Sequence, residues 1–238
     1  MKRFFNISLI LLFSATILFS QSEKILIVTG GKAVDKENFY NLFESFSYDT
    51  TSKPFAFQLF DLDKIENYKA IVFYDTYQPI TEEQKESFMN IFEKRIGVLF
   101  LHHSLVSHQE WNEYENIVGG RYFHQVWVDN EKKYGPSTYK HDQDFLVEII
   151  DRNHPVTNGL DNFQIHDETY LNYRVLPNVS PLLRTNYRES GEILGWTHTY
   201  KNSKVVYIMM GHDKNAFNNK SYRNLIENSI YYLINDSK

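Results

Sequence analysis

Short apolar runs alternate with amphipathic segments over the first hundred residues. The apolar runs, rich in β-branched and aromatic residues, predict buried strands at 24–31, 55–62, 69–76 and 96–104. Apolar residues at helical spacing predict helices over 35–46 and 81–95, and Thr81 followed by acidic residues is typical of a helix start. Continuous apolar strands separated by amphipathic helices predict an α/β fold with a mostly parallel central sheet covered on both faces.

The second half of the chain is less regular. Segment 111–123 predicts a short helix, a Gly-Gly break and the start of a strand, and 144–160 predicts a strand followed by a turn. Segment 191–213 predicts a hairpin around the polar turn KNSK, and 219–236 predicts a closing helix. Because no repeat, low-complexity segment or linker interrupts the pattern, we expect residues 23–238 to form a single domain.

The N-terminal stretch MKRFFNISLILLFSATILFSQSEK has a charged start, Lys2-Arg3, and an apolar stretch over 7–19. This pattern predicts a secretory signal peptide over 1–22. The stretch is shorter than the roughly 20 residues of a membrane span, although an uncleaved anchor and a buried helix remain alternatives. We therefore expect a secreted or periplasmic protein with no membrane association after signal cleavage.

Composition narrows the function classes. The formal charge is −5 and no block of Lys and Arg occurs, so we expect no nucleic-acid partner. The chain has no cysteine, which removes disulfides, thiolate metal sites and a cysteine nucleophile. The sequence leaves the oligomeric state open, a homo-oligomer included.

Polar residues follow three of the predicted strands: Gly30-Gly31, His102-His103-Ser104 and His212-Asp213. Ligands of open α/β sheets bind outside the carboxyl ends of the parallel strands, so these residues are expected at one edge of the sheet. Two adjacent histidines let at least one ring face a ligand. The alternative interpretations are a loop feature for the histidine pair, a tight turn for the glycines and a helix cap for Asp213.

Two further segments contain histidine and need separate treatment. IHDETY, residues 165–170, places His166, Asp167 and Glu168 together, and adjacent acids are costly to bury, so they are either solvated or part of a site. His198 lies opposite about Val205 in the predicted hairpin, roughly 20 Å from His212 along the ladder. His198 is therefore expected to be structural or to belong to another surface.

Several motifs together resemble the ThuA-like family, named for a trehalose-utilisation protein. They are LFLHHS (99–104), IVGGRYFHQ (117–125), NHPVTNGLDNF (153–163), HDETY (166–170), GWTHTYKNSKVVYIMMGHD (195–213) and YRNLIENSIYYL (222–233). The resemblance implies a flavodoxin-like, class I glutamine amidotransferase-like three-layer sandwich. In that superfamily a strand-to-helix turn holds a cysteine nucleophile, and a later strand is followed by a histidine and an acid.

Here the corresponding positions are His102-His103-Ser104 and His212-Asp213, and the lack of cysteine excludes glutamine amidotransferase chemistry. Ser104 is a weak nucleophile candidate, because HHSLV lacks the glycine spacing of a serine-hydrolase elbow. The resemblance instead implies histidine chemistry on a small-molecule carbohydrate, with a 3-keto sugar as the substrate class. Its carbonyl acidifies the C2 proton, so a base can drive elimination, epimerisation or another lyase, isomerase or hydrolase reaction.

We therefore expect a carbohydrate-catabolism protein with catalytic His102, His103, His212 and Asp213. A divalent metal (Zn, Mn or Ni) held by His102 and His212 would serve the same chemistry. The expected substrate-binding residues are Gly30, Gly31, His124, Asp167, Glu168 and Tyr170. The main alternative is a non-catalytic sugar-binding or accessory protein of a polysaccharide-utilisation system, in which Trp111, Trp127 and Tyr122 would contact sugar; a structural interaction domain is a third.

Overall fold

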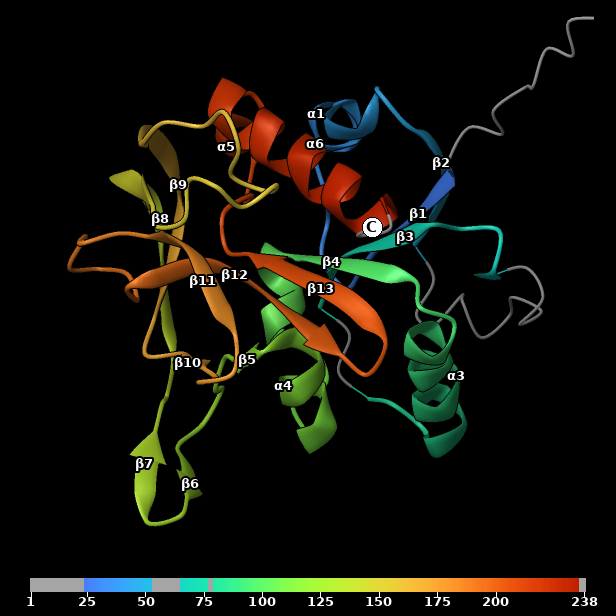
Figure 1. Ribbon diagram of the computed structural model, residues 1–238. Coiled ribbons are helices and arrows are strands. Elements are labelled where there is room, and N and C mark those ends of the chain that lie inside the picture. Colours follow the sequence, from blue (N-terminus) through green and yellow to red (C-terminus); the bar gives the residue numbers. More distant parts are fainter. Residues whose placement is uncertain (1–23, 53–64, 77–78, 236–238) are drawn as a thin grey trace, which may run out of the picture.

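The computed structural model describes residues 24–52, 65–76 and 79–235 (Figure 1). The predicted signal peptide over 1–22 and the predicted strand over 55–62 lie outside the described residues. No helix in the described part of the chain is long and apolar enough to span a membrane.

Five parallel strands form one half of a nine-stranded sheet. They lie in the order β2 (Ser47–Thr51), β1 (Lys24–Gly30), β3 (Ala70–Asp75), β4 (Gly97–Leu101) and β13 (Ser203–Ile208). The residues of β3 and β4 are buried throughout, which explains why both read as continuous apolar runs. β2 was not predicted, because its sequence SYDTT is polar and it lies at the sheet edge.

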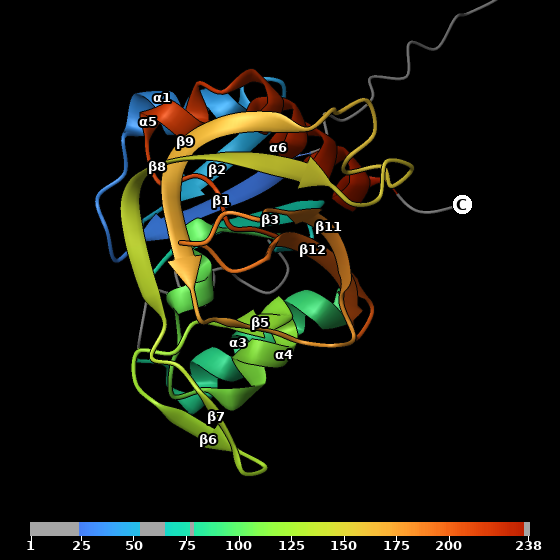
Figure 2. The ribbon, with the colours of Figure 1, turned by 90° about the vertical axis from the view of Figure 1, so that its left-hand side faces the viewer.

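The other half of the sheet is antiparallel. Its strands follow β13 in the order β12 (Ile193–Tyr200), β11 (Ser180–Arg184), β8 (Thr138–Ile149) and β9 (Phe163–Leu171). The sheet is thus mixed, and the expectation of a mostly parallel sheet holds only for the first half. Figure 2 shows β8 and β9 curving along one side of the molecule.

Helices lie on both faces of the parallel half (Figure 1). One face carries α1 (Lys36–Tyr40), η1 (Asn41–Phe43) and α6 (Lys220–Ile234), and the other carries α3 (Glu82–Glu93) and α4 (Asn112–Val118). The Thr81 side chain accepts from the Gln84 backbone and the Gln84 side chain accepts from the Thr81 backbone, so the predicted cap begins α3.

Shorter elements complete the chain. They are η3 (His102–Val106), α5 (Lys214–Phe217), the pair β5 (Gly120–Arg121) and β10 (Arg174–Val175), and the hairpin β6 (Trp127–Asp129) and β7 (Lys132–Tyr134). The β6–β7 hairpin projects from one end of the molecule (Figure 2).

The predicted hairpin over 191–213 is confirmed as β12 and β13, with His198 opposite Val205. His198 is buried, and its Nε2–H donates to the backbone carbonyl of Ile117 in α4 at 3.1 Å. His198 is therefore structural, as the hairpin register predicts.

Candidate functional site

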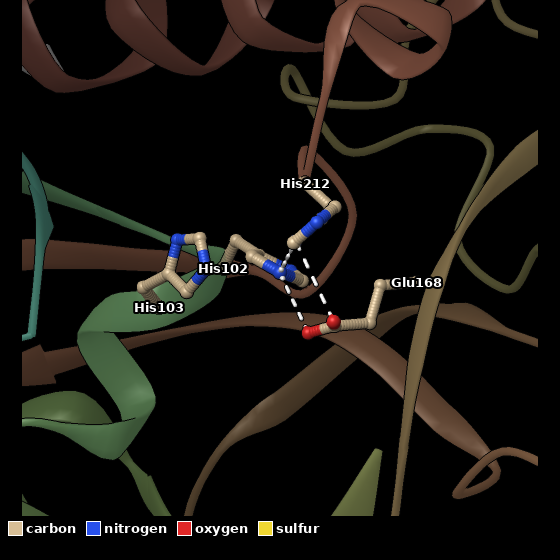
Figure 3. Close-up of side chains that lie close together, drawn as sticks. All are labelled: His102, His103, Glu168 and His212. Atoms are coloured by element: carbon tan, nitrogen blue, oxygen red, sulfur yellow. Dashed lines mark hydrogen bonds and ion pairs between the residues drawn. The ribbon is translucent and has the colours of Figure 1, made fainter. Parts of the chain in front are cut away.

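Two neighbouring parallel strands, β4 and β13, bring the predicted histidines together. In the register of β4 and β13, Leu101 lies opposite Ile208, so the segments that follow these strands leave the same edge of the sheet. His102 is the first residue after β4, and His212 lies four residues beyond the end of β13. Strand β9 adds Glu168, and Figure 3 shows this carboxylate beside His102 and His212, with His103 next to them.

The His102 ring has a fixed orientation. Its Nδ1 lies 2.5 Å from the carbonyl of Met209, and because a carbonyl can only accept, Nδ1 carries the proton. The Nε2 atom lies 3.1 Å from Tyr170 Oη, 3.2 Å from Glu168 Oε1 and 3.3 Å from His212 Nδ1. His102 is fully buried and its backbone lies in the left-handed region at φ 42°, a conformation that costs energy for a residue with a side chain.

Glu168 is buried among imidazoles. Its Oε2 lies 2.7 Å from Nδ1 of His141 and 3.5 Å from Nδ1 of His212. Burial opposes ionisation of Glu168, but the hydrogen bond and charge of His102, with His212 and His141, outweigh burial and lower the pKa of this carboxyl. The neighbouring imidazoles therefore favour the ionised form of this buried carboxyl.

His103 is paired with a lysine from the loop after β1. Lys32 Nζ lies 3.1 Å from His103 Nε2, and because an ammonium can only donate, this Nε2 is the acceptor. Burial, then the neighbouring His102 and Lys32, place the pKa of His103 well below its ordinary value of 6.5. Gly31 permits this loop path: its φ is +76°, and an added Cβ would lie 2.3 Å from the Thr76 hydroxyl oxygen.

Asp167 positions the segment that carries His212. Its buried carboxylate accepts from the backbone N–H of Gly211 at 2.6 Å and of His212 at 2.9 Å. Burial raises the pKa of Asp167 to about 6, against the lowering effects of His102 and three backbone N–H donors. The Tyr74 hydroxyl donates to the His212 carbonyl at 3.2 Å. Asp167 thus holds in place the loop that carries His212.

Three predicted residues lie apart from the cluster. The Asp213 carboxylate caps α5 by accepting from the Asn215 backbone at 2.8 Å, so the acid beside His212 is Glu168. His124 is exposed, with its ring 5.7 Å from that of Tyr122. Gly30 ends β1, and its role is conformational, with a φ of 143°.

Ser104 does not contact an imidazole nitrogen. Its hydroxyl is buried and donates to the Phe73 carbonyl at 2.8 Å and to the Asp75 carboxylate at 3.1 Å. The hydroxyl is turned into the protein interior, which gives no support to a nucleophilic role.

His141 also lies at the site, although it is not among the candidate residues predicted from the sequence. It lies where the β8–β9 register shifts between Lys140 and Gln143, and its ring is 4.7 Å from that of His212. A polar pocket of about 250 Å³ opens here, lined by His141, Asp142, His166, Asp167, Glu168, His212 and Asp213. The sequence signal for His141 is the polar run KHDQD, residues 140–144. This run lies beside IHDETY only in the folded chain, so the signal can be used only when the pairing of β8 with β9 is known.

A family model described as trehalose utilisation (ThuA) matches residues 23–233. The chain belongs to the ThuA family. Sequence comparison with curated proteins finds no significant match.

Solved structures share the ThuA fold. A ThuA-like protein from Parabacteroides merdae is 18% identical, with a TM-score of 0.73. The match covers 92% of this chain and 93% of the Parabacteroides merdae chain. A ThuA-like protein from Bacteroides uniformis is 19% identical with a TM-score of 0.69, covering 94% and 97%. PurLQS from Thermotoga maritima is 13% identical with a TM-score of 0.55, covering 89% and 99%, and glutamine amidotransferase-like folds are among the matches.

The ThuA chain offers a compact set of metal-ligand atoms. His102, His103, Glu168 and His212 each contribute one atom, and these atoms lie within 4.8 Å of one another. The predicted pair His102 and His212 thus lies together, with a carboxylate between them. Imidazole and carboxylate groups in this arrangement can transfer protons or coordinate a divalent metal.

The aromatic residues that would contact sugar in a sugar-binding module are packed against other parts of the protein. Trp111 is 8% exposed and packs against Phe88 at a ring distance of 5.5 Å, and Tyr122 is 6% exposed. The half-buried Trp127 has the Arg121 guanidinium 4.6 Å from its ring centre. The described residues therefore give these three rings no shared open platform.

Proposed function

We propose that this ThuA protein is an exported enzyme of carbohydrate catabolism that removes a proton from a sugar, with 3-keto sugars as the substrate class. Three observations support the proposal: the family description, the buried histidine–carboxylate cluster at a polar pocket, and the signal-peptide pattern over 1–22. We further infer that the parallel half of the sheet, with helices on both faces, is the flavodoxin-like three-layer core that carries the site.

The proposed chemistry needs a base but no nucleophile. The C3 carbonyl acidifies the C2 proton; a base takes that proton, and the electron pair moves onto the C3 oxygen to give an enolate. Return of a proton to the other face of C2 gives an epimer, and loss of the group at C1 gives an elimination product. No step requires the cysteine that this chain lacks.

Two imidazoles are placed to act as the base. The side chains of His212 and His141 are 25% and 48% exposed, and both line the pocket. Burial, then the charge of His102, lowers the pKa of His212, which keeps this ring neutral and able to accept a proton near neutral pH. His102 and His103 lie deeper, where they orient the cluster.

The single observation that carries the proposal is the buried Glu168 carboxylate, surrounded by imidazoles at the wall of a polar pocket. Perturbed ionisable groups gathered in a cleft are a mark of an active site.

Turnover of a 3-keto glycoside tests the proposal. We expect replacement of His102, His103, His212 or His141 by Ala to lower turnover, and loss of the base itself to cost about 10²- to 10⁴-fold. Unchanged turnover in all four variants would contradict the proposed chemistry. Fractionation of the producing cells, with N-terminal sequencing of the mature chain, tests export separately; an intact N-terminus in the cytoplasm would contradict it.

The sugar-binding alternative is less favoured, because the three aromatic residues on which it depends are packed against the protein. Sugar binding that persists in all four histidine variants, without turnover, would restore it.

A further inference from the structure

We infer that His102, His212 and Glu168 bind one divalent transition-metal ion, with His103 held outside its coordination shell. The three side chains come from separate segments, η3, the loop after β13 and strand β9 (Figure 3). Metal binding does not depend on the substrate proposed above.

The spacing of the ligand atoms matches one small coordination sphere. Bonds of about 2.0–2.2 Å at tetrahedral angles place ligand atoms roughly 3.3–3.5 Å apart. In the structure, His102 Nε2 lies 3.3 Å from His212 Nδ1 and 3.2 Å from Glu168 Oε1. His212 Nδ1 lies 3.5 Å from Glu168 Oε2. Glu168 thus faces His102 with Oε1 and His212 with Oε2, and its carboxylate and the two imidazoles surround one ion position.

The orientation of the His102 ring turns Nε2 toward this space. Its Nδ1–H donates to the Met209 carbonyl, so Nε2 is the ring atom that can bind a metal ion. A backbone carbonyl behind a histidine is the usual support of a metal ligand, because it fixes the ring and raises its basicity. Here the carbonyl belongs to the loop that also carries His212, so one short segment orients two of the ligands.

A carboxylate is buried at this point. Glu168 is 2% exposed, its Oε1 lies 3.2 Å from His102 Nε2, and its Oε2 lies 2.7 Å from Nδ1 of His141. A buried carboxylate is costly unless positive charge is paired with it, and a cation between the imidazoles and the carboxylate supplies that charge.

His103 differs from the other two histidines. Its Nε2 accepts from the Lys32 ammonium, which uses the lone pair of the neutral ring and places a positive charge beside it. A cation at that position would repel a metal ion. Two imidazoles and one carboxylate then make a three-ligand site, the number typical of catalytic zinc centres with an open fourth position.

The donor set selects the class of metal. Imidazole nitrogen favours Zn²⁺, Ni²⁺ and related transition metals over Mg²⁺ and Ca²⁺, which prefer oxygen ligands. A bound ion of this class acts as a Lewis acid toward a carbonyl oxygen. With the His212 lone pair bound to the ion, His141 is the pocket imidazole beside Glu168 that is left to accept a proton.

Metal titration of the full chain tests the inference. After dialysis against a chelator, we expect calorimetry to show one equivalent of Zn²⁺ bound, and Co²⁺ to give the visible absorption of a low-coordinate site. Glu168→Gln and His212→Asn should each weaken binding by at least about 100-fold, because each removes a ligand. His103→Gln and His166→Asn are the matched controls and should keep stoichiometric binding. Thermal unfolding of each variant establishes that it is folded.

Absence of stoichiometric binding in the wild-type chain would overturn the inference. So would binding that survives both ligand variants, or that is lost in His103→Gln or His166→Asn. Turnover is scored separately: one bound metal without turnover of a keto sugar supports the metal site and contradicts the proposed function. Turnover by a chain that binds no metal supports the proposed function and contradicts the metal site.

Discussion

At the scale of single residues, Gly211 decides whether the loop carrying His212 can form. Its φ is +115°, and an added Cβ would lie 2.2 Å from the Tyr222 hydroxyl oxygen. That hydroxyl donates to the Met210 carbonyl at 3.1 Å, so a side chain at Gly211 would displace a buried partner as well as strain the backbone.

We predict that Gly211→Ala destabilises the protein more than Gly159→Ala. Gly159 also has a positive φ, +74°, but nothing lies within 4 Å of its added Cβ. Backbone strain alone costs about 1–2 kcal/mol, and the lost Tyr222 hydrogen bond adds about 1 kcal/mol or more to Gly211→Ala. Urea unfolding measures both variants; equal losses would contradict the packing described for Gly211.

Ser104 gives a second prediction at this scale. Because its hydroxyl donates to the Phe73 carbonyl and the buried Asp75 carboxylate, Ser104→Ala should lower the free energy of unfolding by about 1–3 kcal/mol. Turnover by the folded variant should stay within a few-fold of wild type. Loss of turnover without loss of stability would restore Ser104 as a nucleophile.

At the scale of elements, His198 joins strand β12 to helix α4. Burial lowers the pKa of His198 below its ordinary 6.5, against backbone hydrogen bonds that raise it, the largest with Ile117. The neutral ring donates to the Ile117 carbonyl, a bond that fixes the end of α4 near the Gly119 turn.

This lowered pKa predicts how stability varies with pH. Below pH 6.5 the unfolded chain takes up a proton at His198 before the folded chain does. The contribution of His198 is therefore present above pH 6.5 and is lost as the pH falls through the lower folded value. His198→Gln, which can still donate to Ile117, should show a shallower loss of stability between pH 7 and 5. Identical slopes for the two proteins would show that His198 does not titrate as inferred.

At the scale of the whole molecule, the parallel half could be predicted except for its edge strand β2, and the antiparallel half only in part. The strands β3 and β4 are buried on both faces, so their apolar runs identify them. Strand β8 begins with the exposed residues TYKHD, and β9 contains HDET, so neither has the pattern of a core strand. Only the β12–β13 hairpin, with its polar turn, is recognisable by itself.

The same difference between the parallel and antiparallel halves explains which residues of the site could be predicted. His102, His103 and His212 follow parallel neighbours, so the rule for strand ends brings them together. The contacts of Glu168 and His141 depend on the register of β8 with β9, which contains a shift that no local pattern reveals. Asp213 is predicted as the acidic partner of His212 because the two are neighbours in sequence, but Asp213 caps α5 and the carboxylate that contacts His212 is that of Glu168.

Deuterium exchange at C2 of a 3-keto glucoside in D₂O, followed by proton NMR, tests the central claim most directly, because it detects proton removal whatever the final product. We predict that the wild-type chain exchanges this proton well above the spontaneous rate, that Glu168→Gln slows exchange by at least about 100-fold, and that His198→Gln does not slow it. Exchange at the spontaneous rate with the wild-type chain, or at the wild-type rate with Glu168→Gln, would contradict the claim that this cluster is a proton-transfer site.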